Sequence, residues 1–89
     1  MKEIKIARLQ DLYNNIIYKG LDDKLDYIRF NKDTPELIVA KGEDTNIWAI
    51  FINDEGSFTV DDGDTKRGYC SSCEIMDDIE EYLLGGTNG

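Results

Sequence analysis

The sequence predicts an α+β domain in which an antiparallel β-meander sheet of three to four strands is flanked by an N-terminal and a C-terminal α-helix. Three patterns support this prediction: helical spacing of apolar residues near both ends, alternation of apolar and polar residues between them, and loops rich in Gly, Asn and Asp. The 89 residues contain no internal repeat or linker-like tract. We therefore expect residues 1–89 to form a single small domain.

The N-terminal segment has the spacing of an amphipathic helix. Gly20, directly after Lys19, is placed to end it as a C-terminal cap. Residues 1–6 alternate polar and apolar, and they fit either a short strand or the start of this helix, so both alternatives stay open. The apolar stripe of the predicted helix consists of Leu9, Leu12, Tyr13, Ile16 and Ile17.

The central part of the chain alternates in the manner of strands. Residues 53–56, Asn-Asp-Glu-Gly, have the composition of a short hairpin turn, in which glycine supplies a positive φ. Residues 61–68 are polar and contain glycine, and we expect them to be irregular. Strands are predicted at residues 25–30, 37–41 and 47–52, with a further one around Phe58 and Val60.

The segment from residue 47 to 52 is apolar on both of its faces. A strand directs alternate side chains to opposite sides, so Trp48, Ile50 and Ile52 need one cover while Ile47, Ala49 and Phe51 need another. Two helices on opposite faces of the sheet would supply both covers. If both helices lie on one face, the other is an exposed apolar surface of the kind that serves self-association or partner binding. A central strand that Tyr and long side chains cover in part is the third alternative.

The C-terminal segment predicts a second helix that runs to Leu84. Ser71 or Ser72 supplies the N-cap, and Ser71 with Glu74 three residues later has the spacing of a capping box. Gly85 and Gly86 are expected to stop the helix, and residues 87–89 to form a frayed tail. The inward stripe consists of Ile75, Ile79, Tyr82 and Leu83.

Charge is the most informative feature for function. The chain has nineteen Asp and Glu against ten Lys and Arg, has no His, and carries a net charge of −9. Residues 51–89 hold ten of the carboxylates and only Lys66 and Arg67 as cations. Such a one-sided negative field favours basic partners and disfavours direct binding of nucleic acid or of anionic membranes. Neither a signal peptide nor an apolar stretch of about 20 residues is present, which predicts a soluble protein of the bacterial cytoplasm.

Cys70 and Cys73 form the only recognisable short motif, at the predicted start of the last helix. A redox dithiol is one interpretation, because a helix N-terminus favours the thiolate. A zinc site is another; it would need Asp62 or Asp64, or the same cysteine pair of a second subunit, to complete its ligands. Most weight falls on a structural role, in which one or both cysteines fill small core positions.

Residues 61–64, Asp-Asp-Gly-Asp, place hard oxygen ligands close together, which suggests calcium. Their spacing does not match an EF-hand loop, so a solvated turn is the favoured interpretation. With neither a histidine base nor a phosphate-binding loop of the Gly-Lys-Ser/Thr type, the sequence favours a protein that is not an enzyme and needs no cofactor.

The acidic surface is the best functional lead. Carboxylates on a rigid helix resemble the phosphates of DNA and can compete for a basic channel, so we expect an inhibitor of a basic partner such as a CRISPR effector or another nuclease. Small acidic chains of this kind occur among phage-encoded anti-CRISPR and anti-restriction proteins. The alternatives are a small redox or zinc-dependent protein that uses Cys70 and Cys73 and a self-associating module such as a homodimer. The candidate partner-binding residues are Asp61, Asp62, Asp64, Asp77, Asp78 and Glu81.

Overall fold

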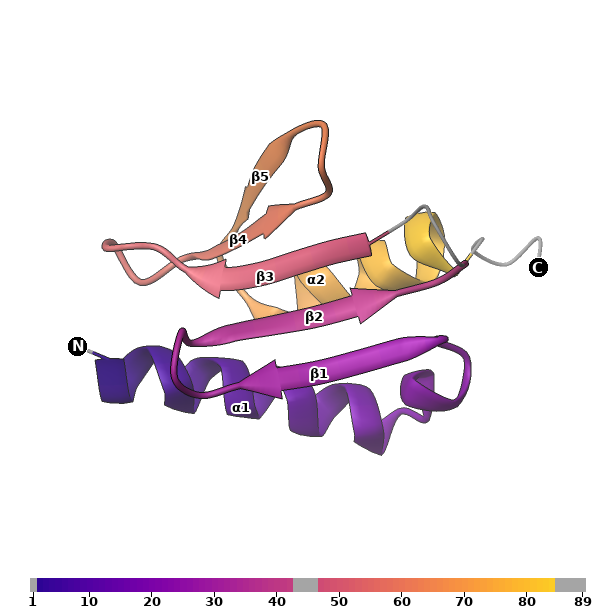
Figure 1. Cartoon of the computed structure of the whole chain (residues 1–89), viewed down its shortest axis with the longest axis horizontal. Coiled ribbons are helices and arrows are strands. Elements are labelled where there is room, and N and C mark those ends of the chain that lie inside the picture. The colour runs from indigo at the N-terminus through magenta and orange to yellow at the C-terminus, as the bar shows by residue number, and fades with distance from the viewer. Residues whose placement is uncertain (1, 43–46, 85–89) are drawn as a thin grey trace.

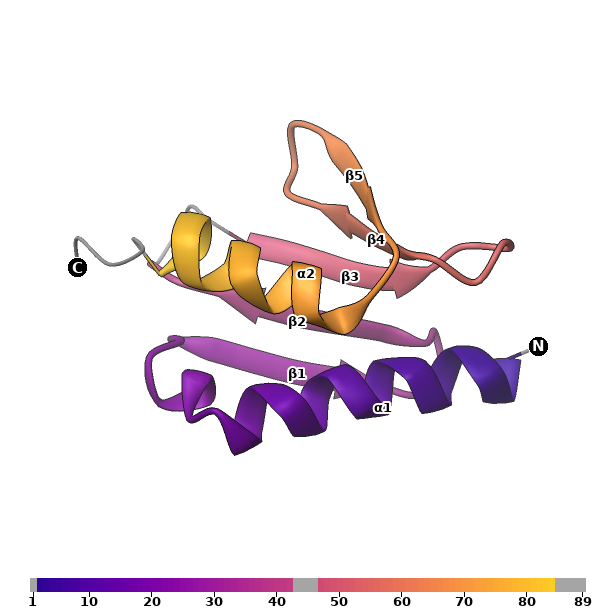
Figure 2. The same cartoon turned by 180° about the vertical axis from the view of Figure 1, so that it is seen from behind.

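A computed structural model describes residues 2–42 and 47–84 of the chain as two layers, an antiparallel sheet and two helices (Figure 1). Helix α1 spans Lys2–Tyr18, helix α2 spans Ser72–Asp78, and α2 continues as a π-helical segment η2 over Ile79–Leu83. Viewed from behind, both helices lie on the same face of the sheet (Figure 2). The predicted α+β class and its two flanking helices are confirmed.

In the described part of the chain the sheet has five strands in sequence order, one more than the upper prediction. Each strand pairs antiparallel with its neighbour, which makes the sheet a simple meander. The predicted strand at residues 25–30 begins two residues later than expected, because Leu25 is instead buried in the core ahead of it. The strands are β1 (Tyr27–Asn31), β2 (Glu36–Ala40), β3 (Ile47–Ile52), β4 (Phe58–Asp61) and β5 (Lys66–Tyr69).

Asparagine side chains organise two of the turns. The Asn31 Oδ1 accepts hydrogen bonds from the backbone N–H groups of Asp33 and Thr34 after β1. The Asn53 Oδ1 does the same for Glu55 and Ser57 after β3, at 2.9 and 3.0 Å. Gly56 completes the second turn with a φ of 88°, a conformation that disfavours other residues. The hairpin turn predicted at residues 53–56 is therefore present.

Helix α1 begins at Lys2, which decides between the two alternatives for the first residues in favour of the helix. Leu9, Leu12 and Ile16 are fully buried against the sheet, and Tyr13 stacks on Phe30 with ring centroids 5.9 Å apart. Ile17 was assigned to the inward stripe but is 40% exposed, because three buried positions already fill the contact. The predicted cap Gly20 adopts a φ of 76° and leads into a short 3-10 turn, η1 (Leu21–Asp23).

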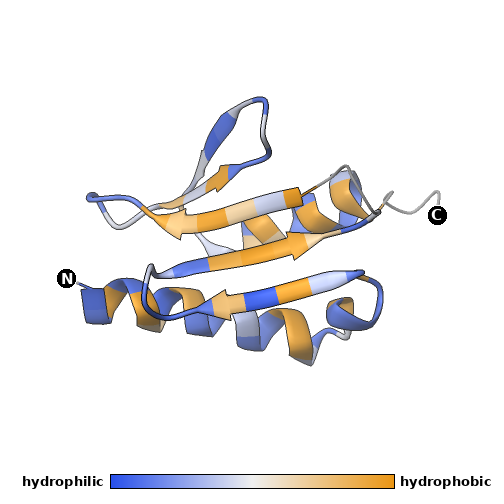
Figure 3. Ribbon diagram, in the orientation of Figure 1, coloured by the Kyte–Doolittle hydropathy of each residue, from blue (hydrophilic) through white to orange (hydrophobic). Residues whose placement is uncertain are grey.

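The prediction that residues 61–68 are irregular was wrong for their second half, where β5 pairs with β4. Figure 3 shows why the strand lacks an apolar signature: β2 and β3 are coloured hydrophobic along most of their length, whereas β5 is largely hydrophilic. Its inward side chains are Arg67 and Tyr69, on the same face as Val60 and Phe58 of β4. Polar side chains that pack over aromatic ones leave no alternation for a sequence pattern to detect.

The second helix starts where it was predicted to start. Ser71 is its N-cap, with its hydroxyl accepting from the Glu74 N–H at 3.4 Å, while the Glu74 carboxylate accepts from the Cys70 N–H at 3.1 Å. In η2 the Leu84 N–H donates to the Ile79 carbonyl, an i→i+5 bond that widens the last turn. Leu83 then follows Ile79 into the core, so Tyr82, predicted to point inward, is 65% exposed. Residues 85–89, with the predicted stop, lie outside the described residues.

The helices cover one face of the sheet, the inner face, where the core lies. Its centre is fully buried at Leu37, Val39, Ile50 and Val60. Helices α1 and α2–η2 contribute Leu9, Leu12, Ile16, Ile75, Ile79 and Leu83 to the same cluster. Within residues 2–42 and 47–84 no helix covers the opposite side, which we call the outer face. It consists of Tyr27, Arg29, Asn31, Glu36, Ile38, Ala40, Ile47, Ala49, Phe51, Thr59, Asp61, Lys66 and Gly68.

Candidate functional site

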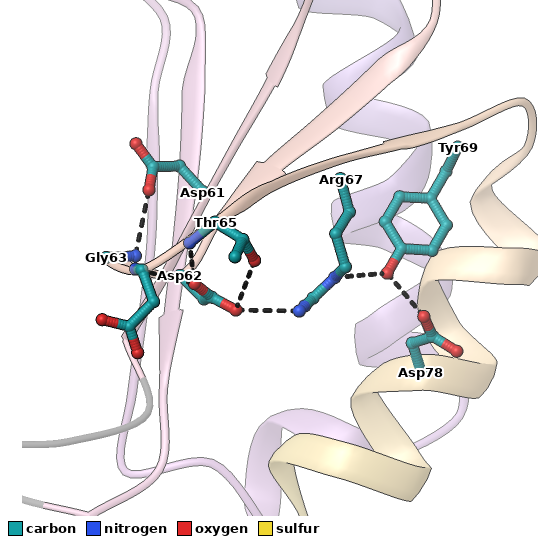
Figure 4. A network of polar contacts seen from close by, with 8 residues as sticks. Asp61, Asp62, Gly63, Thr65, Arg67, Tyr69 and Asp78 are labelled. Atoms are coloured by element: carbon teal, nitrogen blue, oxygen red, sulfur yellow. Dashed lines mark hydrogen bonds and ion pairs between the residues drawn. The ribbon is translucent and has the colours of Figure 1, made fainter.

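Arg67 on β5 is the centre of a polar network that ties the β4–β5 hairpin to α2 (Figure 4). Its Nη1 donates to the Asp62 Oδ2 at 2.8 Å, and its Nε donates to the Tyr69 hydroxyl at 3.1 Å. The Tyr69 hydroxyl in turn donates to the Asp78 Oδ2 on α2. Strand alternation puts Arg67 and Tyr69 on one face, which brings the turn, the strand and the helix into one connected chain of bonds.

The guanidinium of Arg67 also lies over the ring of Trp48, with its Cζ 4.8 Å from the ring centroid. A cation over an indole face is attracted by the negative face of the ring. Its Nη2 is buried and has no hydrogen-bond partner among the described residues. The stacking on Trp48 therefore supplies part of the stabilisation that this N–H group does not receive from an acceptor.

The turn before β5 uses its own carboxylates. The Asp61 Oδ1 accepts from the Gly63 N–H at 2.9 Å, and the Asp62 Oδ1 accepts from the N–H groups of Asp64 and Thr65 at 2.9 and 2.8 Å. These backbone bonds, followed by the charge of Arg67, hold the pKa of Asp62 below its usual value. The turn interpretation of residues 61–64 is thus supported over the calcium alternative, because two of the three carboxylates already serve backbone donors.

Tyr69 stays protonated over a wider pH range than a free tyrosine. Partial burial raises its pKa first, and its hydrogen bond to Asp78 raises it further, while Arg67 acts in the opposite direction. The neutral hydroxyl is the form that both donates to a carboxylate and accepts from a guanidinium. Arg67 and Tyr69 were not singled out by the sequence analysis. The available signal was that they are two positions apart, and so on one face of a strand, shortly before a helix rich in carboxylates.

The exposed side of α2–η2 carries carboxylates without cations. Asp77 and Glu81, four residues apart and so neighbours on one helix face, are exposed, and no Lys or Arg of the described residues forms an ion pair with either. Glu80 is different, because its Oε1 lies 3.8 Å from the Lys19 Nζ. We call Glu74, Asp77 and Glu81 the acidic ridge; they recur three and four residues apart, so they follow one side of the helix.

The structure separates the six predicted partner-binding residues into three groups. Asp62 and Asp78 belong to the Arg67–Tyr69 network, and Asp78 is only partly exposed. Asp61 lies on the outer face, across the sheet from α2. Only Asp64, Asp77 and Glu81 are exposed and make no hydrogen bond or ion pair through their carboxylates within the described residues. The expected single patch is therefore divided, and its free part lies on the turn and on the ridge.

Both cysteines are exposed free thiols, so the interpretation that they fill core positions was wrong. Cys70 precedes the N-cap and Cys73 lies in the first turn of α2, where Ile75 and Met76 fill the inward positions instead. Among residues 2–42 and 47–84, no group of three or more Cys, Asp or Glu side chains is arranged to hold a metal ion.

No helix in the described part of the chain combines the length and apolar character needed to cross a membrane. Comparison of the sequence with protein-family models and with curated proteins, and of the structure with solved structures, gave no match.

Proposed function

We propose that this chain is a non-enzymatic binding protein that uses the acidic ridge, with Asp64, to occupy the basic nucleic-acid-binding surface of a larger protein. The observation that carries the proposal is the row of exposed carboxylates at Glu74, Asp77 and Glu81 with no cation in contact with the latter two. A surface charge that no neighbour neutralises acts on approaching molecules at long range. Basic partners are the class that such a field attracts.

The ridge is also held rigidly, which supports a docking role over a merely solubilising one. Asp78, one residue from Asp77, is fixed through Tyr69 and Arg67, and Ile75, Ile79 and Leu83 anchor the opposite side of the helix in the core. Carboxylates on a fixed element lose little conformational entropy when they bind. We propose a nuclease of a bacterial defence system, a CRISPR effector or a restriction enzyme, as the partner, with the ridge as a mimic of DNA phosphates.

Two matched variants test this function. The ridge variant carries Asp64→Asn, Asp77→Asn and Glu81→Gln. The control variant carries Asp11→Asn, Asp23→Asn and Asp33→Asn, which remove the same number of exposed negative charges elsewhere. Each tagged protein is used to capture partners from the lysate of a bacterium with active defence systems, and the capture is repeated in the presence of duplex DNA and at high salt.

The expected result is recovery of a basic nuclease by the wild type and the control variant, with loss in the ridge variant, in excess DNA and at high salt. The purified nuclease should then cleave its DNA substrate more slowly when the wild type is added. Equal recovery by the ridge and control variants would contradict the proposal, as would capture that duplex DNA does not reduce.

The exposure of both thiols favours one second candidate, a function that depends on the cysteine pair. The variant with Cys70→Ser and Cys73→Ser separates the two functions. A charge-driven inhibitor keeps its nuclease inhibition in this variant, because neither thiol contacts the ridge carboxylates through a hydrogen bond in the described structure. If the function depends on the two thiols instead, the cysteine variant loses its activity, whereas the ridge variant keeps it.

A further inference from the structure

The outer face differs from the rest of the molecule in charge. The chain as a whole carries −9, yet the outer face holds two cations, Arg29 and Lys66, and two anions, Glu36 and Asp61. Between them lie large apolar side chains, of which Tyr27 is 46% exposed and Ile47 is 47% exposed. A neutral, apolar face on an otherwise negative protein offers no attraction to a basic partner and no net repulsion to a copy of itself.

The strand register arranges this face as a self-complementary pattern. One row crosses the whole sheet from β1 to β5 as Arg29, Ile38, Ala49, Asp61 and Lys66. Its four positions on β1 to β4 run, read from either end, from a charge through two apolar side chains, one large and one small, to the opposite charge. Lys66, on the edge strand β5, continues the row beyond Asp61. A two-fold axis parallel to the strands, between β2 and β3, superposes such a row on its own reverse.

We propose that two copies of this chain pack outer face to outer face about that axis. In this arrangement Arg29 of each copy faces Asp61 of the other, twice over. Ile38 faces Ala49, and in the next row Ala40 faces Ile47, so the two isoleucines of β2 and β3 each meet an alanine. Two sheets stacked with their strands nearly aligned are a common packing of twisted sheets.

The shape of the face fits this partner. A hollow lined by Asp26, Tyr27, Ile38, Ala40, Gly42 and Ile47 opens on the outer face at the end where Ala40 and Ile47 lie. The two-fold axis directs Ile47 of the second copy toward Ala40, one of the residues that line this hollow. In the third row Glu36 faces Phe51, so the methylenes of the glutamate cover the ring while its carboxylate remains at the rim.

Charge reversal at the paired positions tests the arrangement, with sedimentation equilibrium over a series of protein concentrations as the measurement. Arg29→Asp or Asp61→Arg alone turns two attractive pairs into two repulsive ones and is expected to weaken dimerisation about tenfold or more. The double variant restores both pairs with reversed sign and is expected to recover the dimer. Lys24→Asp, the same charge change at an exposed site off this face, is the control and leaves the dimer unchanged.

Phe51 supplies a second test that depends on the axis as well as on the face. In Phe51→Glu the new carboxylate faces Glu36 of the second copy, so this variant is expected to abolish the dimer. In Phe51→Lys the new ammonium group faces the same Glu36, so this variant is expected to retain more of the dimer. A wild type that stays monomeric at every concentration overturns the proposal. So does a dimer in which the single and double charge reversals behave alike. Circular dichroism confirms that each variant is folded.

The dimer and the proposed function stand independently. The helices lie on the inner face, so a pair joined through the outer faces keeps both acidic ridges on its outside. Loss of the dimer in Phe51→Glu therefore leaves the ridge intact, and the ridge variant leaves the outer face intact.

Discussion

The two faces of the sheet are built from the same five strands and differ in burial and composition. On the inner face Leu37, Val39, Ile50 and Val60 are fully buried, and even the charged Arg67 is held over Trp48. On the outer face large and small side chains share the rows, one row has a charge near each end, and Ile47 remains half exposed. The buried core therefore lies on one face of the sheet, and the composition of the other face is less constrained by packing.

Two isoleucines of β3, one on each face, give the largest expected difference in stability. Ile50→Ala on the inner face is expected to lower the free energy of unfolding by about 2–5 kcal/mol, because it opens a cavity in a closed core. Ile47→Ala on the outer face, at a concentration where the protein is monomeric, is expected to cost less than about 1 kcal/mol. Urea unfolding measures both. Equal losses would show that the outer face is as important to the fold as the inner one.

The polar part of the inner face is tested by Tyr69→Phe. This change removes the donor to Asp78 and the acceptor for Arg67 while it keeps the ring. We expect a loss of about 1–2 kcal/mol, since both bonds involve charged partners and the site is partly exposed. Tyr82→Phe, at a 65% exposed position, is the matched control and should be neutral. If the two variants unfold at the same urea concentration, the network does not stabilise the hairpin.

The turn that leads into this network predicts a dependence on pH. The pKa of Asp62 is lower in the folded chain than its ordinary value of about 3.9, so the unfolded chain takes up the proton first as the pH falls. The stabilisation by Asp62 is therefore present at neutral pH and is lost as the pH falls through the folded-state pKa. Asp62→Asn should be less stable than the wild type at pH 7, with the difference vanishing in strong acid. A difference that persists at the lowest pH would contradict the assignment.

The smallest effect is expected on the acidic ridge. Asp77 and Glu81 are like charges four residues apart on one helix face, an arrangement that costs a few tenths of a kcal/mol. Asp77→Asn with Glu81→Gln should leave stability unchanged or raise it by about 0.5 kcal/mol, as thermal unfolding will show. A loss above about 1 kcal/mol would mean that the ridge has a structural role. A loss of binding in the ridge variant could then result from lower stability.

Local patterns in the sequence sufficed for most of the framework. The spacing of Leu9, Leu12 and Ile16, the Asn53–Gly56 turn and the Ser71 cap each depend on neighbours within a few residues, and all three are as predicted. Strand β5 was missed because its inward side chains are polar. Arg67 packs on Trp48, and Tyr69 donates a hydrogen bond to Asp78. No local sequence pattern predicts that a polar side chain will pack over an aromatic ring that is distant in the sequence.

The candidate site divides in the same way. The exposure of Asp64, Asp77 and Glu81 followed from charge and helical spacing, whereas the use of Asp62 and Asp78 inside a network depended on how β5 meets α2. The exposure of Cys70 and Cys73 likewise depended on Ile75 and Met76 filling the inward positions.

Spacing and alternation in the sequence are enough to predict two helices and a meander sheet, and they show that the strand from Ile47 to Ile52 is apolar on both sides. These patterns leave open whether the two helices lie on opposite faces of the sheet or on the same face. The folded structure places both helices on the inner face, a choice that depends on how the chain crosses the sheet at its two ends. Backbone propensity and alternation act between near neighbours, but the side of a sheet on which a helix packs is set by the whole core.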